Sequence, residues 1–317
     1  MHKSPLDPLE LSALQQRIGR WYLQQSRSLP WRTGKNTPWE VMVSEFMLQQ
    51  TPVKRVLPVW EAWMDRWPSP ASLAAEESGE AVRAWGRLGY PRRALRLHAA
   101  AQAILERHQG QVPADYDQLL ALPGVGSYTA AAISVFAFGA RATVIDTNIR
   151  RVHARLISGK ALPAKALTAA ETRLAEQLLP KDLEASCLWN VSVMELGALI
   201  CTAKSPACER CPVFDSCAWI RAGRPEADYV PQGQAWAGTD RQLRGAMMGL
   251  LRAASEPLPA AYLTQAWTAD LLVPPELGPA FEKLRALSPD SEQISRCFEG
   301  LLADGLARRV EGGRVSL

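Results

Sequence analysis

Residues 122–155 read LPGVGSYTAAAISVFAFGARATVIDTNIRRVHAR, and this stretch decides both the fold and the candidate chemistry. Its turn, Gly124-Val125-Gly126, lacks a Cβ atom at two positions, which permits a tight turn and the close approach of another backbone. A helix predicted to start near Ser127 directs unpaired N–H groups outward, where the helix dipole favours a phosphate oxygen. Such turns are also common in ordinary loops, so the residues downstream must decide between a phosphate site and a plain turn.

An aspartate follows the β-branched run in the same stretch. Asp146 comes directly after Val144-Ile145 and immediately before a predicted helix, which makes it the natural N-cap. Capping N–H groups and the helix N-terminus favour the charged carboxylate, so we expect Asp146 to stay ionised at neutral pH. An aspartate at such a position usually caps a helix and does nothing more. A second carboxyl group in a different environment would instead favour a catalytic role for Asp146.

The second informative stretch is WEVMVSEFMLQQT, residues 39–51. On a helix, the neighbours of Glu45 are Val41, Met42 and Leu48, so its carboxyl group lies on an apolar face. This placement costs free energy unless the carboxyl group is protonated, or paired with a buried arginine or a backbone amide.

Glu45 and Asp146 form a pair whose surroundings push their pKa values apart, and such a difference assigns the roles of acid and base. Cleavage of a glycosidic bond needs this combination. A protonated carboxyl group activates the leaving group, and a carboxylate stabilises or traps the oxocarbenium-like sugar. The pair therefore makes a catalytic role for both residues a better hypothesis than either residue supports alone.

Other side chains are candidates for contact with nucleic acid. Residues 83–107 carry a dense run of arginines around Tyr90; such runs are usually solvated faces, but an aromatic ring among arginines also suits base insertion. Arg27 and Trp31 lie close to Pro30, where core packing is the alternative to a base pocket. The helix around Glu45 ends with uncharged hydrogen-bonding groups that suit base edges. The candidates are Gln49, Gln50, Thr51, Tyr90, Gly124, Val125, Gly126, Arg27 and Trp31.

Composition bounds the class of protein. The chain has 317 residues, enough for about two domains, and its hydrophobic content of 47% supplies full cores. It shows no apolar run of about 18 residues and no signal-peptide pattern, so we expect a cytoplasmic protein with no membrane partner. The net charge of +4 permits an anionic partner without demanding one.

Four of the six cysteines crowd into residues 201–217. Disulfides are not expected in a reducing cytoplasm, so these cysteines are interpreted as ligands of a metal or a cluster. A zinc ribbon usually has two C-x2-C pairs, whereas C-x6-C-x2-C-x5-C has one and is more typical of an iron–sulfur cube held by four thiolates. The candidate ligands are Cys201, Cys208, Cys211 and Cys217.

The remaining sequence predicts helices and one domain boundary. Helical patterns cover residues 9–25, 57–105 and 161–194, and no strand-like alternation appears before residue 305, which predicts an all-α core. A linker rich in Pro, Gly and Gln is expected over residues 224–238. Beyond it, three helices and a hairpin predict a small winged-helix-like α+β domain over residues 239–317. The helices are expected at 241–254, 258–268 and 291–304, and the hairpin at 307–317.

Five motifs occur in order along the chain: SEFMLQQT, LGY before an arginine-rich helix, LPGVGSYTA, DTNIRRV and the four-cysteine pattern. Over about residues 9–222 this combination resembles the helix-hairpin-helix DNA glycosylases with an iron–sulfur cluster, and more closely the A/G-specific adenine DNA glycosylases. The resemblance implies a mainly α fold with a two-lobed, all-helical core of residues 1–223. We expect a six-helix lobe at about 30–145 and a lobe with the [4Fe-4S] cluster at about 1–29 and 146–223.

The resemblance also implies an activity and a partner. The family removes adenine mispaired with 8-oxoguanine or guanine after flipping the base out of the duplex. The expected partner is therefore double-stranded DNA that contains an adenine mispair. A nucleotide cofactor is not expected, and we expect a monomer associated with the nucleoid.

Residue roles follow from the same resemblance. Glu45 would protonate the adenine, and Asp146 would face the developing sugar cation. Tyr128 and Asn148 would support the pocket. Gln50 and Tyr90 would insert at the opposite base, and the four cysteines would hold [4Fe-4S]. Bifunctional relatives such as endonuclease III carry a lysine at position 128, whose amine forms a Schiff base, so tyrosine there predicts base removal without efficient strand cleavage.

The chain departs from the family pattern in four places. Thr147 replaces a usual Gly, Pro91 replaces a second Tyr, and Val191 stands where many members place Gln or Glu. The usual C-terminal domain, which reads 8-oxoguanine, is not recognisable. Two alternatives therefore remain beside the adenine glycosylase: a thymine or uracil mismatch glycosylase on the same scaffold, and a DNA-binding or redox-sensing protein that carries a cluster without catalysis.

Overall fold

The structure is a computed structural model that describes residues 6–230, 233, 235–268 and 270–317. Contacts divide the chain into two compact units. The first unit is the described part of Met1–Glu45, Pro113–Ala121 and Val125–Pro231, and the second is that of Phe46–Val112, Leu122–Gly124 and Gln232–Leu317. The lobe and linker boundaries expected from the sequence stay a prediction, because these units are defined by contacts alone.

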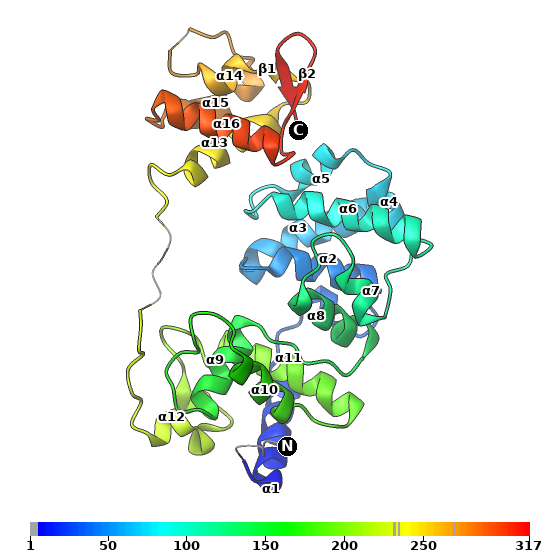
Figure 1. Ribbon diagram of the computed structural model, residues 1–317, viewed down its shortest axis with the longest axis vertical. Helices are drawn as coiled ribbons and strands as arrows, with labels where there is room; N and C mark the ends of the chain where they lie inside the picture. The colour runs from blue at the N-terminus through cyan, green and yellow to red at the C-terminus, as the bar shows by residue number, and fades with distance from the viewer. Residues whose placement is uncertain (1–5, 231–232, 234, 269) are drawn as a thin grey trace. The chain divides into compact units, whose positions relative to one another are not determined.

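The first unit is helical and contains both predicted catalytic carboxyl groups. Its elements are α1 (Pro8–Gln25), η1 (Pro30–Arg32), most of α2 (Pro38–Leu48), α7 (Tyr116–Leu120), α8 (Ser127–Phe138), α9 (Thr147–Leu156), α10 (Ala169–Leu178), α11 (Leu183–Leu199), η2 (Cys208–Arg210), η3 (Phe214–Ser216) and α12 (Ala218–Arg221). Helix α11 packs against both α1 and α9, and α9 and α11 lie side by side (Figure 1). A single apolar core joins these helices through residues such as Ile18, Ile149 and Val193.

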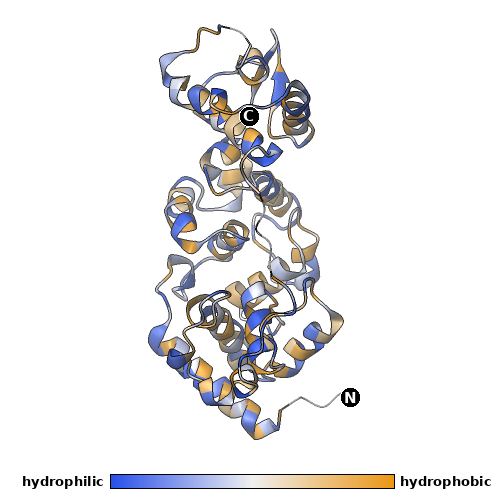
Figure 2. Cartoon of the chain, turned by 90° about the vertical axis from the view of Figure 1, so that its left-hand side faces the viewer, coloured by the Kyte–Doolittle hydropathy of each residue, from blue (hydrophilic) through white to orange (hydrophobic). Residues whose placement is uncertain are grey.

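Helices α8 and α11 are apolar around most of their circumference, which is the pattern of helices at the centre of a fold. Most helices in Figure 2 instead carry both hydrophilic and hydrophobic colour along their length. Helix α11 approaches α9 closely at Gly197, where a Cβ atom would lie 2.7 Å from Asn148 Cβ. A glycine is therefore required there, because any side chain would push α9 away.

The glycine turn and the aspartate cap form as the sequence predicts. Helix α8 starts at Ser127 with Gly126 as its N-cap, and α9 starts at Thr147 with Asp146 as its N-cap. Gly124 has a φ of 76°, and a Cβ atom there would lie 2.6 Å from Arg96 Cβ, so this position also demands glycine. Helices α7 and α8 pack against each other, which gives the helix-hairpin-helix pair that the family resemblance implies.

The second unit begins within α2 and contains helices and one small sheet. Its elements are α3 (Val53–Arg66), α4 (Pro70–Ala74), α5 (Ser78–Trp85), α6 (Arg92–Arg107), α13 (Asp240–Ala253), β1 (Leu258–Pro259), α14 (Ala261–Thr264), η4 (Pro275–Leu277), α15 (Gly278–Arg285), α16 (Ser291–Ala303), β2 (Arg308–Val310) and β3 (Arg314–Ser316). Helix α6 packs on α4 and α5, and the three indole rings of Trp63, Trp67 and Trp85 meet edge to face in the core.

The C-terminal part of the second unit has the expected winged-helix-like mixture of helices and sheet. Helix α13 packs on α15 and α16 (Figure 1), and the antiparallel sheet has the order β1-β3-β2. Val315 is fully buried and pairs with both Leu258 and Arg309. The predicted hairpin is present and turns at Glu311-Gly312-Gly313, where both glycines adopt positive φ.

Two predictions about this domain are wrong. The sequence pattern predicts a single helix over residues 258–268, but Leu258–Pro259 is strand β1 and only Ala261–Thr264 is helical. Pairing of Leu258 with Val315, far along the chain, overrides the local helical pattern. The set of three predicted helices also omits α15, although its buried Phe281 and Leu284 have helical spacing.

No helix in the described ranges has both the length and the apolar character needed to span a bilayer.

Candidate active site

Glu45 is buried in the first unit and is hydrogen-bonded to a tyrosine. Its side chain is only 5% exposed, and Tyr128 Oη donates to Glu45 Oε2 at 2.9 Å. Burial raises the pKa of Glu45 to about 7; the Tyr128 hydrogen bond and the Arg32 charge oppose this shift, and the Asp146 charge adds to it. Glu45 can therefore hold a proton at neutral pH and release it to a bound molecule.

Asp146 is the N-cap of α9, as predicted, but burial changes its electrostatics. Its Oδ1 accepts the Ile149 N–H at 2.6 Å, and its Oδ2 accepts from the Asn148 side-chain amide at 2.7 Å. Burial nevertheless raises the pKa of Asp146 above its ordinary value, against the effect of these hydrogen bonds. The sequence indicated only the capping hydrogen bonds, which favour the charged form of Asp146. The burial that raises its pKa arises from tertiary packing and could not be read from the neighbouring residues.

Asn148 connects Asp146 to the cysteine loop through a buried arginine. Arg151 donates to Asn148 Oδ1 at 2.8 Å and, through Nε, to the carbonyl oxygen of Cys201 at 2.7 Å. Arg151 also donates to the carbonyl oxygen of Gly197 at 2.7 Å, which ties α9 to α11. Three consecutive hydrogen bonds therefore join the candidate carboxylate to the backbone of a candidate cluster ligand. Sequence reasoning gave Arg151 no role, although it lies in the DTNIRRV motif, because the motif does not show which groups its side chain contacts.

The four cysteines of the loop are free thiols that lie near one another. Burial raises the pKa of Cys211 to about 12, and the charges of Cys201, Cys217 and Cys208 raise it further, so the four sulfur atoms lie within electrostatic reach. In the described ranges, no three Asp, Glu, His or Cys side chains converge as ligands of one metal ion do. Four thiols that lie near one another in one loop are the donor set that holds an iron–sulfur cube, so the residues fit such a group.

Two arginines hold this loop in place. From α9, Arg155 donates to Cys201 Sγ at 3.5 Å and to the carbonyl oxygen of Thr202 at 2.7 Å. From α1, Arg17 donates to the carbonyl oxygen of Pro212 at 2.9 Å and forms a short ion pair with Asp215 at 2.6 Å. The loop is therefore anchored to two helices of the first unit.

Glu195 is a further buried carboxylate, one that the sequence reasoning missed. Its side chain has no exposed area, and it pairs with Arg27 at 2.7 Å and with Arg32 at 2.9 Å. These hydrogen bonds and charges outweigh desolvation and lower the pKa of Glu195 to about 2. The pattern that singled out Glu45, an acid within an apolar helix, also applies to Glu195 in α11.

A cavity of about 670 Å³ opens beside Glu45. Its lining includes a carboxyl group, a guanidinium group, an indole ring, an amide and two valines: Glu45, Arg32, Trp31, Asn36, Val41 and Val191. Trp31 is only 3% exposed and is both a core residue and part of this wall, so core packing and a place in the base pocket are compatible. The cavity combines an apolar wall with a few polar groups, which is the usual character of a site for a small organic ligand.

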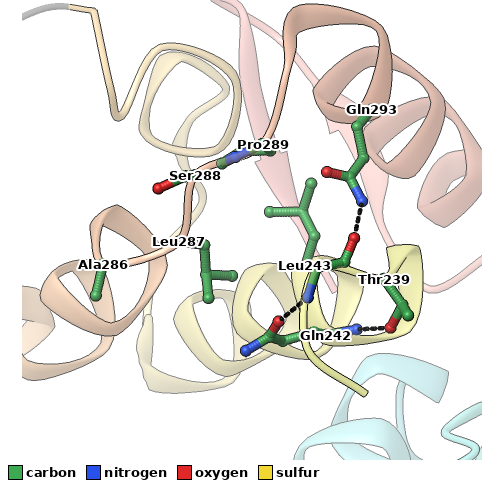
Figure 3. Close-up of a pocket in the computed structure, with 9 residues that line it drawn as sticks. Thr239, Gln242, Leu243, Ala286, Leu287, Ser288, Pro289 and Gln293 are labelled. Atoms are coloured by element: carbon green, nitrogen blue, oxygen red, sulfur yellow. Dashed lines mark hydrogen bonds between the residues drawn. The ribbon is translucent and has the colours of Figure 1, made fainter. Parts of the chain in front are cut away.

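A smaller cavity of about 280 Å³ lies in the C-terminal domain (Figure 3). Thr239 and Gln242 at the start of α13 face Leu287, Ser288 and Pro289 across it. None of its lining residues has a titratable side chain. This cavity therefore lacks the acid that glycosidic cleavage requires, whereas the cavity beside Glu45 has one.

The other predicted DNA-contact residues lie in two places. Val125 and Gly126 are in the first unit, at the start of α8, where Gly126 is exposed and no described side chain hydrogen-bonds to the helix N-terminus as a cap. The second unit contains Gly124, Gln49, Gln50, Thr51 and Tyr90. Gln50 and Tyr90 have positive φ angles of 55° and 48°, and Tyr90 is 44% exposed. Thr51 is buried and hydrogen-bonded to Arg93, and Gln49 accepts from Arg93 through its carbonyl oxygen.

Comparison with known proteins gives the same class as the site. Residues 43–177 match the HhH-GPD superfamily of base excision DNA repair proteins, and residues 201–217 match the iron–sulfur binding domain of endonuclease III. The fold is therefore that of a helix-hairpin-helix base excision repair protein. The prediction of a [4Fe-4S] cluster is confirmed, and the matched segment is the loop that carries the four cysteines.

Relatives narrow the class. An adenine DNA glycosylase from Mycobacterium tuberculosis is 44% identical over 298 residues, which are 94% of this chain and 91% of the relative. A thymine-DNA glycosylase from Aeropyrum pernix is 32% identical over 215 residues, 67% of this chain and 96% of the relative. A solved thermostable thymine-DNA glycosylase has a TM-score of 0.60 at 25% identity, covering 68% of this chain and 98% of its own. Since the first match also spans most of the C-terminal domain, the chain belongs to the adenine DNA glycosylase family.

Proposed function

We propose that this adenine DNA glycosylase acts on adenine mispaired with 8-oxoguanine or guanine and cleaves the N-glycosidic bond without cutting the strand. The observation that carries the proposal is the buried Glu45, whose pKa of about 7 and position on the 670 Å³ cavity suit an acid that protonates a bound base. Membership of the family indicates that adenine is the base removed. The identity of the base opposite the adenine is proposed here.

The chemistry divides between two carboxyl groups. Glu45 transfers its proton to a ring nitrogen of the everted adenine, so the base leaves as a neutral molecule when the bond to the sugar breaks. Asp146, held by the Ile149 N–H and the Asn148 amide, presents a carboxylate to the cationic sugar, and water completes the hydrolysis. Because Glu45 accepts one hydrogen bond and Asp146 accepts two, the proton resides on Glu45 before Asp146.

Tyr128 explains why strand cleavage is not expected. It donates to Glu45 and so holds the acid in place, but a phenol cannot form the Schiff base that a lysine would form. Treatment of a reaction with borohydride should therefore trap no covalent protein–DNA complex. Trapping at the level of a bifunctional glycosylase would contradict this part of the proposal.

DNA contacts are assigned to two sets of residues. The uncapped N-terminus of α8, at Gly124-Val125-Gly126, offers N–H groups to a backbone phosphate. Gln50 and Tyr90, which we call the wedge residues, insert beside the base opposite the adenine, with Gln49 and Thr51 next to Gln50. Arg27 and Trp31 support the base cavity, since Arg27 pairs with Glu195 and Trp31 lines the wall.

The four cysteines hold the [4Fe-4S] cluster, which crosslinks the loop of residues 201–217 when it is bound. Around it, Arg155 and Arg17 neutralise charge and anchor the loop to α9 and α1. Lys204, Arg210 and Arg221 lie on this loop and its neighbour, where positive charge suits a second contact with the DNA backbone.

The proposal is tested by measuring base release from four duplexes that carry A:8-oxoguanine, A:G, T:G and U:G. We expect release of adenine from the first two and none from the others. Thymine or uracil release without adenine release would instead support the second candidate, a mismatch glycosylase for pyrimidines. That candidate is favoured by the 32% identity to the thymine-DNA glycosylase from Aeropyrum pernix.

One substitution tests whether Glu45 is the acid that protonates the base. Glu45→Gln keeps the shape and hydrogen-bonding capacity of the side chain but cannot donate an acidic proton, so it should bind mispaired DNA and release no base. Binding is measured by fluorescence anisotropy and release under single-turnover conditions. Near-normal release by the variant would show that the acid lies elsewhere.

We also propose that the protein works as a monomer on nucleoid DNA, because both carboxyl groups, the tyrosine and the cluster ligands come from one chain. Sedimentation of the protein with one mispaired duplex should give a 1:1 complex. A complex with two protein chains per mispair would contradict this.

A further inference from the structure

Arg93 is a buried cation with an unusual set of partners. Its side chain is only 6% exposed, and its hydrogen bonds go to backbone carbonyl oxygens and one hydroxyl group rather than to a carboxylate. A buried charge is expensive unless it is hydrogen-bonded, and Arg93 Nε has no partner among the described residues, so the acceptors of Nη1 and Nη2 must be held in place for Arg93 to stay buried. Arg93 thus requires a particular backbone geometry around it.

The partners belong to two separate segments of the second unit. At the end of α2, Arg93 Nη1 donates to the carbonyl oxygens of Phe46 at 3.0 Å and Gln49 at 2.5 Å. In the same segment after α2, Arg93 Nη2 donates to Thr51 Oγ1 at 3.1 Å. In the segment before α6, Arg93 Nη2 donates to the carbonyl oxygen of Gly89 at 3.1 Å. One guanidinium group therefore holds the turn after α2 and the turn before α6 together.

Two of these carbonyl groups lie immediately before a strained residue. Gln49 precedes Gln50, with a φ of 55°, and Gly89 precedes Tyr90, with a φ of 48°. A left-handed conformation at a residue other than glycine costs roughly 1–3 kcal/mol and persists only where the surroundings impose it. Both strained residues are wedge residues, and Arg93 also lies 5.4 Å from the centre of the Tyr90 ring.

We propose that Arg93 is a positioning residue that sets the two wedge residues, Gln50 and Tyr90, for insertion into the duplex, so that the adenine is extruded efficiently. The inference rests on the proposed function, because it assumes that the wedge residues enter the DNA. Arg93 contacts neither the base nor the reacting carboxyl groups. It acts through the backbone of the residues before the wedge.

The test separates extrusion from chemistry and from binding. All variants are made in the Glu45→Gln background, and the target adenine is replaced by 2-aminopurine, whose fluorescence rises when it leaves the stack. With Glu45→Gln alone we expect a rise in fluorescence on saturation. If that rise is missing, the proposed function fails before the inference is tested.

Arg93→Met should reduce the rise in fluorescence at saturation at least fivefold, while anisotropy still shows binding. Arg93→Lys keeps the charge but cannot reach both turns at once, so it should restore only part of the signal. The control is Arg107→Met, an exposed arginine of the same helix, which should leave the signal unchanged. A full rise in fluorescence with Arg93→Met would overturn the proposal.

A milder variant covers the case in which Arg93→Met does not fold. Thr51→Val removes one acceptor of Arg93 and keeps the size of the side chain. It should lower extrusion about twofold at saturating protein, with normal cluster absorbance. An unchanged signal in folded Thr51→Val together with a full signal in Arg93→Lys would equally rule out the role.

Discussion

The phenol of Tyr128 donates to Glu45 Oε2 at 2.9 Å, which links the first turn of α8 to the acid on α2. This hydrogen bond lowers the pKa of Glu45 against the effect of burial. Tyr128→Phe should therefore raise the pKa of Glu45 above about 7 and, because the acid loses its anchor, slow adenine release about tenfold, the size of one hydrogen bond to a charged group. Single-turnover rates across pH measure both effects. If Tyr128→Phe releases adenine more slowly but its rate falls at the same alkaline pH as that of the wild type, Tyr128 positions Glu45 without changing its pKa.

The wild-type protein should lose activity as the pH rises through about 7, because Glu45 must carry its proton to act as an acid. The single-turnover rate is expected to be highest below this pH, until Asp146 is protonated in turn. The control is Glu299→Gln, a surface glutamate paired with Arg309, which should keep the alkaline limb. A rate that stays flat as the pH rises from below to well above this value would contradict the assignment of Glu45.

Arg151 should couple the cluster loop to the active site. Arg151→Gln breaks the bonds to Asn148 and to the Cys201 carbonyl, so both adenine release and the iron content of the protein should fall, with release down about tenfold or more. The matched control is Arg150→Gln, whose bonds go to Ala164, Ala166 and Glu171 instead. Equal effects of the two substitutions would refute a specific link through Arg151.

Glu195 should stabilise the fold in a pH-dependent way. Its pKa is lowered from 4.5 to about 2, which corresponds to about 3 kcal/mol at neutral pH. This stability is present above the ordinary pKa of a glutamate and is lost as the pH falls through about 2. Urea unfolding at about pH 7 and about pH 3 should show that Glu195→Gln is strongly destabilising at neutral pH and less so in acid.

The control for Glu195 is Glu299→Gln, because Glu299 pairs with Arg309 on the surface. An exposed pair contributes only about 0–1 kcal/mol, so this substitution should change little at either pH. A Glu195→Gln variant as mild as the control would mean that the two arginines do not depend on Glu195.

The C-terminal domain should affect the opposite base through Arg241. Its guanidinium group lies 5.2 Å from the centre of the Tyr90 ring and 5.5 Å from that of Trp236. Arg241→Ala should weaken binding to A:8-oxoguanine DNA about 2–10-fold, the range for a cation–π contact, and reduce its advantage over A:G. Arg285→Ala, which removes a similar contact with Phe281 in the same domain, should not. If both variants prefer A:8-oxoguanine over A:G DNA as strongly as the wild type does, the contact of Arg241 with Tyr90 does not contribute to this preference.

Local signals made much of the site predictable. Glycine and N-cap chemistry placed the starts of α8 and α9 correctly, because capping depends on a few adjacent residues. The burial of Glu45 was also indicated locally, because its neighbours on the helix, Val41, Met42 and Leu48, are apolar. The cysteine spacing indicated the cluster, since four thiols crowded into one short loop of a reduced protein are most often ligands of a metal or a cluster.

Other parts of the site could not be predicted from local pattern. Arg93, Arg151 and Glu195 each depend on at least one partner about 40 or more positions away in the sequence, and nothing in their own neighbourhoods marks those distant partners. Strand β1 escapes sequence prediction for the same reason, because its residues pair with the C-terminus.

The sequence by itself determined the family, the helical core and the presence of the cluster, and it indicated the candidate ligands and the two candidate carboxyl groups, since these follow from residue identity and short-range spacing. Only the tertiary structure decided the protonation of those groups and the arginines that organise them. Burial sets a pKa, and hydrogen bonds between distant segments set a position, and both exist only once the chain has folded.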